Sequence, residues 1–134
     1  MNFTHQEKLT ILNQLIQLAG ADGEHRDEEY DLIHKVTEQL QLEPMETEML
    51  FIKSIDEHYP KSEVKRITVF FYLLLMVAAD GEIDRDETHL LRELSLKLAL
   101  PLEAVNNSIA LLDVYPNGNI PSEEIIKIFQ THHN

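Results

Sequence analysis

Two short acidic segments hold most of the side chains in this chain that could do chemistry. Residues 22–31 contain six carboxylates and residues 80–87 contain five, which together is almost half of the 24 acidic residues. Carboxylate oxygens are the ligands that Mg²⁺ and Ca²⁺ prefer. The pattern therefore predicts a candidate site for a divalent cation, with Mg²⁺ or Ca²⁺ as the expected ion. Its candidate ligands are Asp22, Glu24, Glu29, Asp80, Glu82, Asp84 and Glu87.

The position of two of these acids needs an explanation. Asp22 and Asp80 each follow a predicted helix, where the negative end of the helix dipole disfavours a carboxylate. The compensating group could be a bound cation, the guanidinium of Arg26 or Arg85, or the backbone N–H groups of the next helix. Docking of a protein partner on the acids is a further alternative. The sequence leaves these four explanations open.

Several site classes are excluded or disfavoured. A calcium EF-hand needs Gly at loop position 6 and Glu at position 12, but a loop starting at Asp80 has Arg85 and Leu91 there. The chain has no Cys, and it contains neither the metalloprotease HExxH pattern nor the hydrolase GxSxG pattern. We expect the carboxylates to be exposed and crowded, without the apolar pocket that would raise the pKa of one of them. The sequence therefore predicts no enzyme, since an enzyme would need a pocket with a buried acid.

The net charge of −13 limits the partners. It argues against nucleic acid and against anionic lipid, because both bind through Lys and Arg. The longest apolar run, residues 67–79, is too short for a bilayer, which needs about 20 residues. The N-terminus lacks a signal-peptide pattern. We expect a cytoplasmic protein without membrane insertion that binds a protein partner, with a divalent cation as a further possibility.

Helical spacing of apolar residues runs through the whole chain and predicts about seven helices. Capping-box patterns, in which a side chain and a backbone N–H bond each other reciprocally, occur at Thr4/Glu7 and Asp84/Glu87. Gly23 and Gly81 are the expected stops of the first and fourth helices. The third helix is expected over about 45–58 with Met45, Met49 and Ile52 facing inward, the fourth over 62–79, the sixth from Pro101 to about Asp113, and the last over 122–131 with a stripe of Ile125, Ile126 and Phe129. Ile83 is also expected to point inward.

Two parts of the chain align with each other when Ala21 is placed on Ala79, and we call this pairing the repeat alignment. It puts the sequence ADGE at 21–24 on ADGE at 79–82, and Glu29 on Glu87. Two copies are too few for an open solenoid. The repeat therefore predicts an all-α fold, a compact bundle with internal pseudo-two-fold symmetry. We expect one domain over residues 1–134, with copies at about 5–58 and 62–115.

These residues carry a resemblance to a known family. A helix ending in A-D-G-x-I-x-x-x-E, followed by an amphipathic helix, resembles the tellurite-resistance TerB-like family, which includes regulatory N-terminal domains of some membrane-anchored J-domain co-chaperones. Residues 79–87 fit the pattern at each position, whereas the first copy has His25 and Arg26 in place of Ile83 and Asp84.

The resemblance implies a seven-helix, non-enzymatic, stress-linked domain whose two acidic turns bind a divalent cation or a protein partner. The alternative is a protein-interaction, scaffold or co-chaperone-type regulatory module that has a partner groove and no metal. The fuller motif makes the second turn the more favourable cation site.

Overall fold

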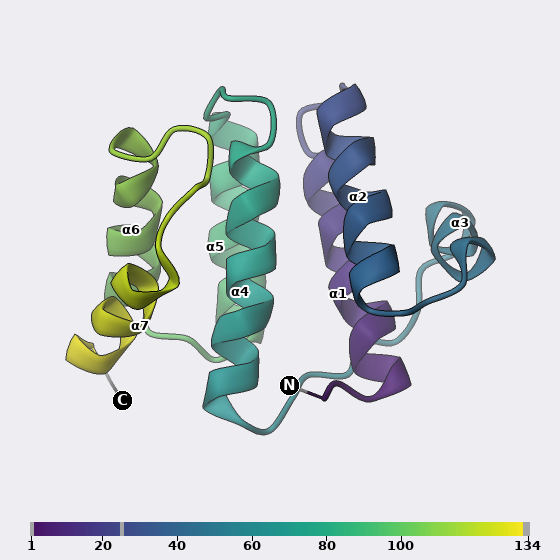
Figure 1. Cartoon of the computed structure of the whole chain (residues 1–134), viewed down its shortest axis with the longest axis horizontal. Coiled ribbons are helices and arrows are strands. Elements are labelled where there is room, and N and C mark those ends of the chain that lie inside the picture. The colour runs from purple at the N-terminus through teal and green to yellow at the C-terminus, as the bar shows by residue number, and fades with distance from the viewer. Residues whose placement is uncertain (1, 25, 133–134) are drawn as a thin grey trace.

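The computed structural model describes residues 2–24 and 26–132, and this part of the chain is all-helical (Figure 1). It contains seven α-helices, one 3₁₀ turn and no strand, which confirms the expected fold class. No helix in the described ranges is long and apolar enough to cross a membrane. The elements are α1 (His5–Ala19), α2 (Asp27–Gln39), α3 (Pro44–Ile52), α4 (Glu63–Ala78), α5 (Arg85–Lys97), α6 (Leu102–Ala110), η1 (Leu111–Asp113) and α7 (Ser122–Thr131).

The repeat alignment holds for three successive helices. α1, α2 and α3 begin at His5, Asp27 and Pro44, which fall on the first residues of α4, α5 and α6, namely Glu63, Arg85 and Leu102. Each copy is therefore a three-helix unit, although sequence identity marks only the first two helices. The copies meet through α1 and α4, whose mutual packing is the most extensive in the fold.

The core forms along the apolar stripes of these two helices. Leu12, Leu15, Phe70 and Leu73 are fully buried between the copies. The ring of Phe129 in α7 packs edge-on against Phe70, with ring centroids 5.5 Å apart. Burying such side chains is the main favourable term in folding, so the paired copies form a rigid base for the turns at the ends of α1 and α4.

Both acidic turns begin where the first helix of each copy ends. α1 ends at Ala19 and α4 at Ala78, a few residues before the glycines that were expected to stop them. Gly23 and Gly81 both have φ of +79°, a left-handed conformation that costs Gly little. Each glycine therefore reverses the chain within the turn and leads it into the next helix.

The expectation for the third helix was wrong in two respects. α3 ends at Ile52, because an extended segment follows it up to residue 60. Met45, Met49 and Ile52 are 68%, 52% and 80% exposed. The short helix instead buries Thr47 and Leu50 against α1 and α2. Ile126 in α7 is likewise 49% exposed, so the last helix buries only Ile125 and Phe129 of the expected stripe.

Gly118 provides a test of how the loop before α7 packs. Its φ is +76°, and a Cβ added there would lie 3.1 Å from the Ala78 Cβ and 3.3 Å from the Leu75 Cδ2. We expect Gly118→Ala to lower the free energy of unfolding by about 2 kcal/mol, through backbone strain and crowding. Gly81→Ala, which has the same strain but open space around it, should cost about 1 kcal/mol. Urea unfolding of both variants measures the difference, and equal losses would contradict close packing at Gly118.

Candidate functional site

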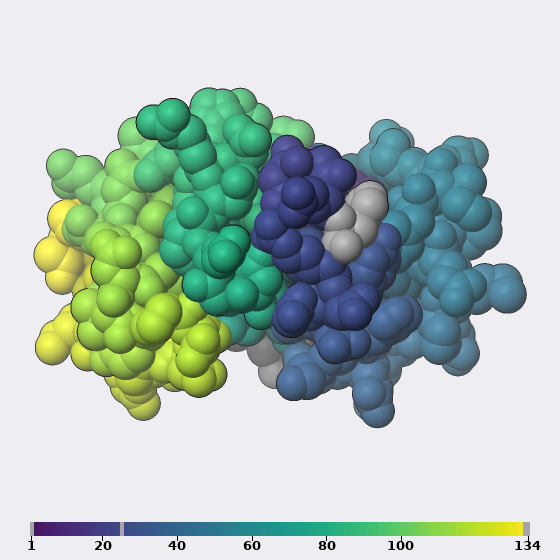
Figure 2. Space-filling view, turned by 90° about the horizontal axis from the view of Figure 1, so that it is seen from above, coloured from purple at the N-terminus to yellow at the C-terminus, as the bar shows by residue number. Residues whose placement is uncertain are grey.

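The two acidic turns lie against each other at one end of the bundle. Both occupy the same end in Figure 1, and the view onto that end shows them in contact (Figure 2). The guanidinium of Arg26, which follows the first turn, donates a hydrogen bond and forms an ion pair with Asp80 of the second turn. The repeat therefore places two similar acidic segments at a single site.

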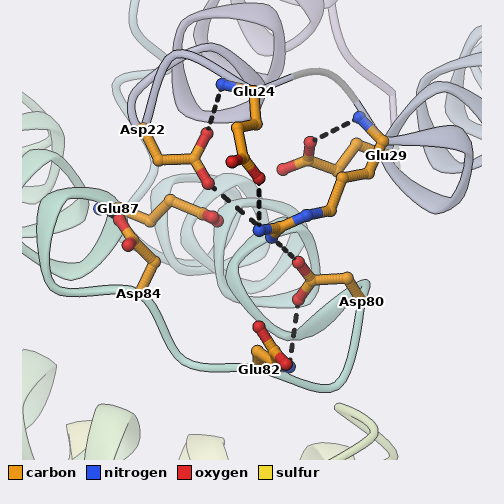
Figure 3. Close-up of polar contacts among 8 residues, drawn as sticks. Asp22, Glu24, Glu29, Asp80, Glu82, Asp84 and Glu87 are labelled. Carbon is orange, nitrogen blue, oxygen red and sulfur yellow. Dashed lines mark hydrogen bonds and ion pairs between the residues drawn. The ribbon is translucent and has the colours of Figure 1, made fainter.

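Arg26 gathers three carboxylates around its guanidinium. In addition to Asp80, its Nη2 lies 2.8 Å from the Glu24 Oε2 and its Nη1 lies 3.6 Å from the Asp22 Oδ2 (Figure 3). The side chains of Asp22 and Asp80 are only 10% and 8% exposed. Arg26 therefore supplies part of the compensation that acids at a helix C-terminus require.

Backbone N–H groups supply another part. The Asp22 Oδ1 accepts from the N–H of Glu24 at 2.9 Å, and the Asp80 Oδ1 accepts from the N–H of Glu82 at 3.0 Å. At the start of α5 the Asp84 Oδ2 accepts from the N–H of Glu87, also at 3.0 Å. Two of the compensations expected from the sequence, an arginine and backbone N–H groups, therefore operate together.

Glu29 and Glu87 were expected to be exposed, and this was wrong. Each is only 1% exposed, because the first turns of α2 and α5 face each other across the joined copies. The Glu29 Oε1 accepts from the N–H of Arg26 at 3.3 Å, while its Oε2 has no hydrogen-bond partner. Neither carboxyl oxygen of Glu87 has one. The expected capping box at Asp84 is thus half formed, since the Glu87 side chain does not bond back to the backbone.

Burial raises the pKa of the Glu87 carboxyl to about 8, and the negative charges of Glu29, Asp80, Asp22 and Asp84 add to the effect. Burial also raises the pKa of Glu29, while its bond from the Arg26 N–H acts in the opposite direction. Removal from water disfavours a charged carboxylate, and neighbouring charges of the same sign disfavour it further. A buried acid therefore lies between the two turns and retains a proton near neutral pH.

Asp22, Asp84 and Glu87 form the most compact group of possible ligands in the described residues. One carboxylate oxygen from each lies within 4.8 Å of the others. In Figure 3 the Glu87 side chain points toward the centre of the cluster, with Asp22 and Asp84 beside it. Two of these acids come from the second turn and one from the first, so the group exists only because the copies are paired.

The other candidate ligands lie outside this compact group. Asp80 and Glu24 are bound to Arg26, and the Glu24 side chain is 68% exposed. Glu82 is exposed and contributes its backbone N–H to Asp80. Glu29 lies close enough to Glu87 to raise its pKa. Six carboxyl groups in the joined turns thus surround one guanidinium, namely those of Asp22, Glu24, Glu29, Asp80, Asp84 and Glu87.

Comparison with known proteins adds a family to this geometry. The family model described as tellurite resistance protein TerB matches residues 1–50. This match supports a TerB-like family assignment. No curated protein and no solved structure matches the chain. The matched part of this TerB-like chain covers α1, α2, most of α3 and the first acidic turn. The second turn, which has the fuller motif, lies outside the match and is related to it by the internal repeat.

Two further positions of the TerB-like motif differ from expectation or cannot be compared. Ile83 is 42% exposed, so the expectation that it points inward was wrong. The reason is that α5 begins directly after its N-cap Asp84, which leaves Ile83 in the turn. His25, the equivalent of Ile83 in the first copy, lies outside the described residues. The burial of Glu29 and Glu87 could have been inferred from their matched places in the repeat, at the third position of α2 and of α5.

A buried acid raises the question of catalysis, because that was the feature an enzyme would need. Glu29 lines a hollow of about 160 Å³ together with Ile16, Ala19, Tyr30 and Phe51. Substrate pockets usually measure about 300–1,000 Å³. The hollow beside Glu29 is therefore too small for most substrates, and the arrangement is better suited to binding an ion.

Proposed function

We propose that this TerB-like chain is a non-enzymatic, stress-linked helical domain that binds one divalent cation between its two acidic turns. The observation that carries the proposal is the Glu87 carboxyl, which is buried and has no hydrogen-bond partner on either oxygen. A buried carboxyl without partners is costly. A cation at Asp22, Asp84 and Glu87 would remove that cost.

The internal compensations do not extend to Glu87. Arg26 and backbone N–H groups bond to Asp22, Asp80 and Asp84. The remaining electrostatic imbalance is concentrated at Glu87, whose raised pKa follows from burial and from four neighbouring carboxylates. This imbalance favours cation binding over simple capping as the role of the second turn.

The donor set indicates a hard cation. All three candidate ligands are carboxylates, which suit Ca²⁺, Mg²⁺ and Mn²⁺. Ligand oxygens on opposite sides of a Ca²⁺ ion lie about 4.6–5.2 Å apart, and those around Mg²⁺ about 4.2 Å apart. The spread of up to 4.8 Å between the three oxygens fits Ca²⁺ with little movement and Mg²⁺ after slight contraction, with water in the remaining positions.

Calorimetric titration with CaCl₂ and MgCl₂ tests the proposal. We expect the wild type to bind about one Ca²⁺ per chain, and Glu87→Gln and Asp84→Asn each to weaken binding at least tenfold, because each removes a ligand charge. Asp86→Asn is the matched control, since Asp86 is an exposed acid of the same turn outside the compact group. Absence of binding heat in the wild type, or equal weakening by Asp86→Asn, would contradict the proposed site.

A further inference from the structure

Three adjoining hollows run along one face of α4. Their volumes are about 530, 350 and 270 Å³. The first and second share Ile67, Thr68 and Ile126, and the second and third share Leu75. Residues of α7 and α2 line the two sides, in agreement with the position of α4 between these helices in Figure 1. We call this continuous depression the α4 groove.

The floor of the α4 groove is an apolar helical stripe. Val64, Ile67, Phe71 and Leu75 recur at intervals of three and four residues along α4, and all line the hollows. Val64 is 62% exposed, and Ile126 on the α7 wall is 49% exposed. Contiguous exposed apolar surface of this kind marks interaction sites more often than scattered apolar residues do.

The first copy of the repeat provides an internal comparison. In the repeat alignment, the residues of α1 that correspond to Val64, Phe71 and Leu75 are Gln6, Asn13 and Gln17. The extended segment after α3 also binds α1 through polar groups. The His58 N–H donates to the Thr10 Oγ1 at 2.8 Å, and the Gln14 Nε2 donates to Glu57 at 2.8 Å. One copy therefore has polar residues at these positions and a helix bound by its own chain, and the other has an apolar face that lines an open groove.

We propose that the α4 groove binds an amphipathic helix of a partner protein that has basic residues beside its apolar stripe. The distance from Val64 to Leu75 along α4 is about 16 Å, the length of about three helical turns. Apolar side chains at helical spacing in a groove between two helices fit a helix laid along them, as in other helix-in-groove complexes. This proposal does not depend on cation binding at the acidic turns.

Charge decides the chemistry of the partner. Glu28 and Asp31 line the hollow near the C-terminal end of α4, and both are exposed and have no ion pair in the described part of the chain. Lys35 is the one base in that lining. The chain as a whole carries a net charge of −13. A basic helix is attracted by this field, whereas a second copy of the same chain is repelled.

Fluorescence anisotropy with a designed peptide tests the proposal. The probe is a labelled helical peptide of about 16 residues, long enough to span the groove at the helical rise, with Leu at helical spacing and Lys on the flanking positions. We expect saturable binding to the full chain, with a Kd at least tenfold higher for Val64→Glu and for Ile126→Glu. Glu28→Gln combined with Asp31→Gln should raise the Kd severalfold at low salt and have little effect at high salt, where screening shortens the range of charge interactions.

The control variant is Ile52→Glu, which places the same charge on an exposed apolar residue outside the groove. It should bind the Lys-flanked peptide like the wild type. Absence of saturable binding to the wild type would overturn the proposal. So would equal weakening by Ile52→Glu, or equally tight binding of a peptide with Glu in place of Lys. A dimer of the chain alone, seen by analytical ultracentrifugation and dissociated by Ile126→Glu, would assign the groove to a second copy and overturn the proposed partner.

Discussion

The Glu87→Gln variant is expected to be more stable than the wild type at pH 8 when metal has been removed. The expected gain in the free energy of unfolding is about 3 kcal/mol, because each unit of pKa shift corresponds to about 1.4 kcal/mol. The wild type must bury a charged carboxylate beside other carboxylates at this pH. An uncharged amide of similar shape has no such cost, and its NH₂ group can donate to the neighbouring acids.

The gain should depend on pH in a defined direction. Burial and the neighbouring carboxylates raise the pKa of Glu87 from 4.5 to about 8 in the folded protein. The folded state therefore holds the proton more tightly than the unfolded state, so the contribution of Glu87 to stability is fully present below pH 4.5 and is lost as the pH rises toward 8. The difference between variant and wild type should be near zero at pH 4.5 and largest at pH 8 and above.

Urea unfolding in EDTA at several pH values between 4.5 and 8.5 measures this difference. Asp86→Asn is again the control, and its stability should follow that of the wild type across the series, because Asp86 is exposed. A Glu87→Gln variant that is less stable than the wild type at pH 8 would contradict the buried, unpartnered carboxyl. Added Ca²⁺ should stabilise the wild type and not this variant, since only a protein that binds the ion gains from it.

The sequence predicted the helices well because their signals are local. The Thr4/Glu7 capping box is present, and α7 occupies the expected residues. The failures came where burial depends on a neighbour distant in the sequence. Met45, Met49 and Ile52 have helical spacing but lie on the outer face of α3. Periodicity predicts a helix and its apolar face but does not show whether another element covers that face.

The candidate site shows the same division. Residue types and the repeat identified the acids, but their burial follows from the pairing of α1 with α4, which brings both turns to one end of the bundle. Glu29 and Glu87 are ordinary third residues of a helix when the sequence is considered alone. They become buried only when the two helix starts face each other. The sequence therefore identified the chemical groups, while the environment that sets the pKa of Glu87 is a property of the tertiary structure.

Arg26 explains why two similar turns need not be two equal cation sites. The repeat alignment relates the compact group Asp22, Asp84 and Glu87 to Asp80, Arg26 and Glu29. In the second set the guanidinium stands where the first set has a carboxylate, and it is bonded to Asp80. One half of the joined site thus contains its own cation, and the other half has a buried acid without a partner.

The Arg26→Asp variant should consequently convert the occupied half into a second cation site. Without metal we expect its melting temperature to fall by about 5 °C or more, because Asp22, Asp80 and Glu24 lose their shared ion-pair partner and a further acid is added. With Ca²⁺ the variant should recover more stability than the wild type gains, and calorimetry should count about two ions per chain in place of one.

Arg26→Gln separates loss of the arginine from gain of a ligand. It removes the same positive charge but adds no carboxylate, so it should be destabilised without metal and should still bind one Ca²⁺ through Asp84 and Glu87. If Arg26→Asp folds in Ca²⁺ and still binds a single ion, the two halves are not equivalent as sites. If the wild type binds none, the proposed cation site itself fails. The ion count in these three proteins therefore distinguishes a repeat that only duplicates a helix connector from one that duplicates a binding site and fills one copy with arginine.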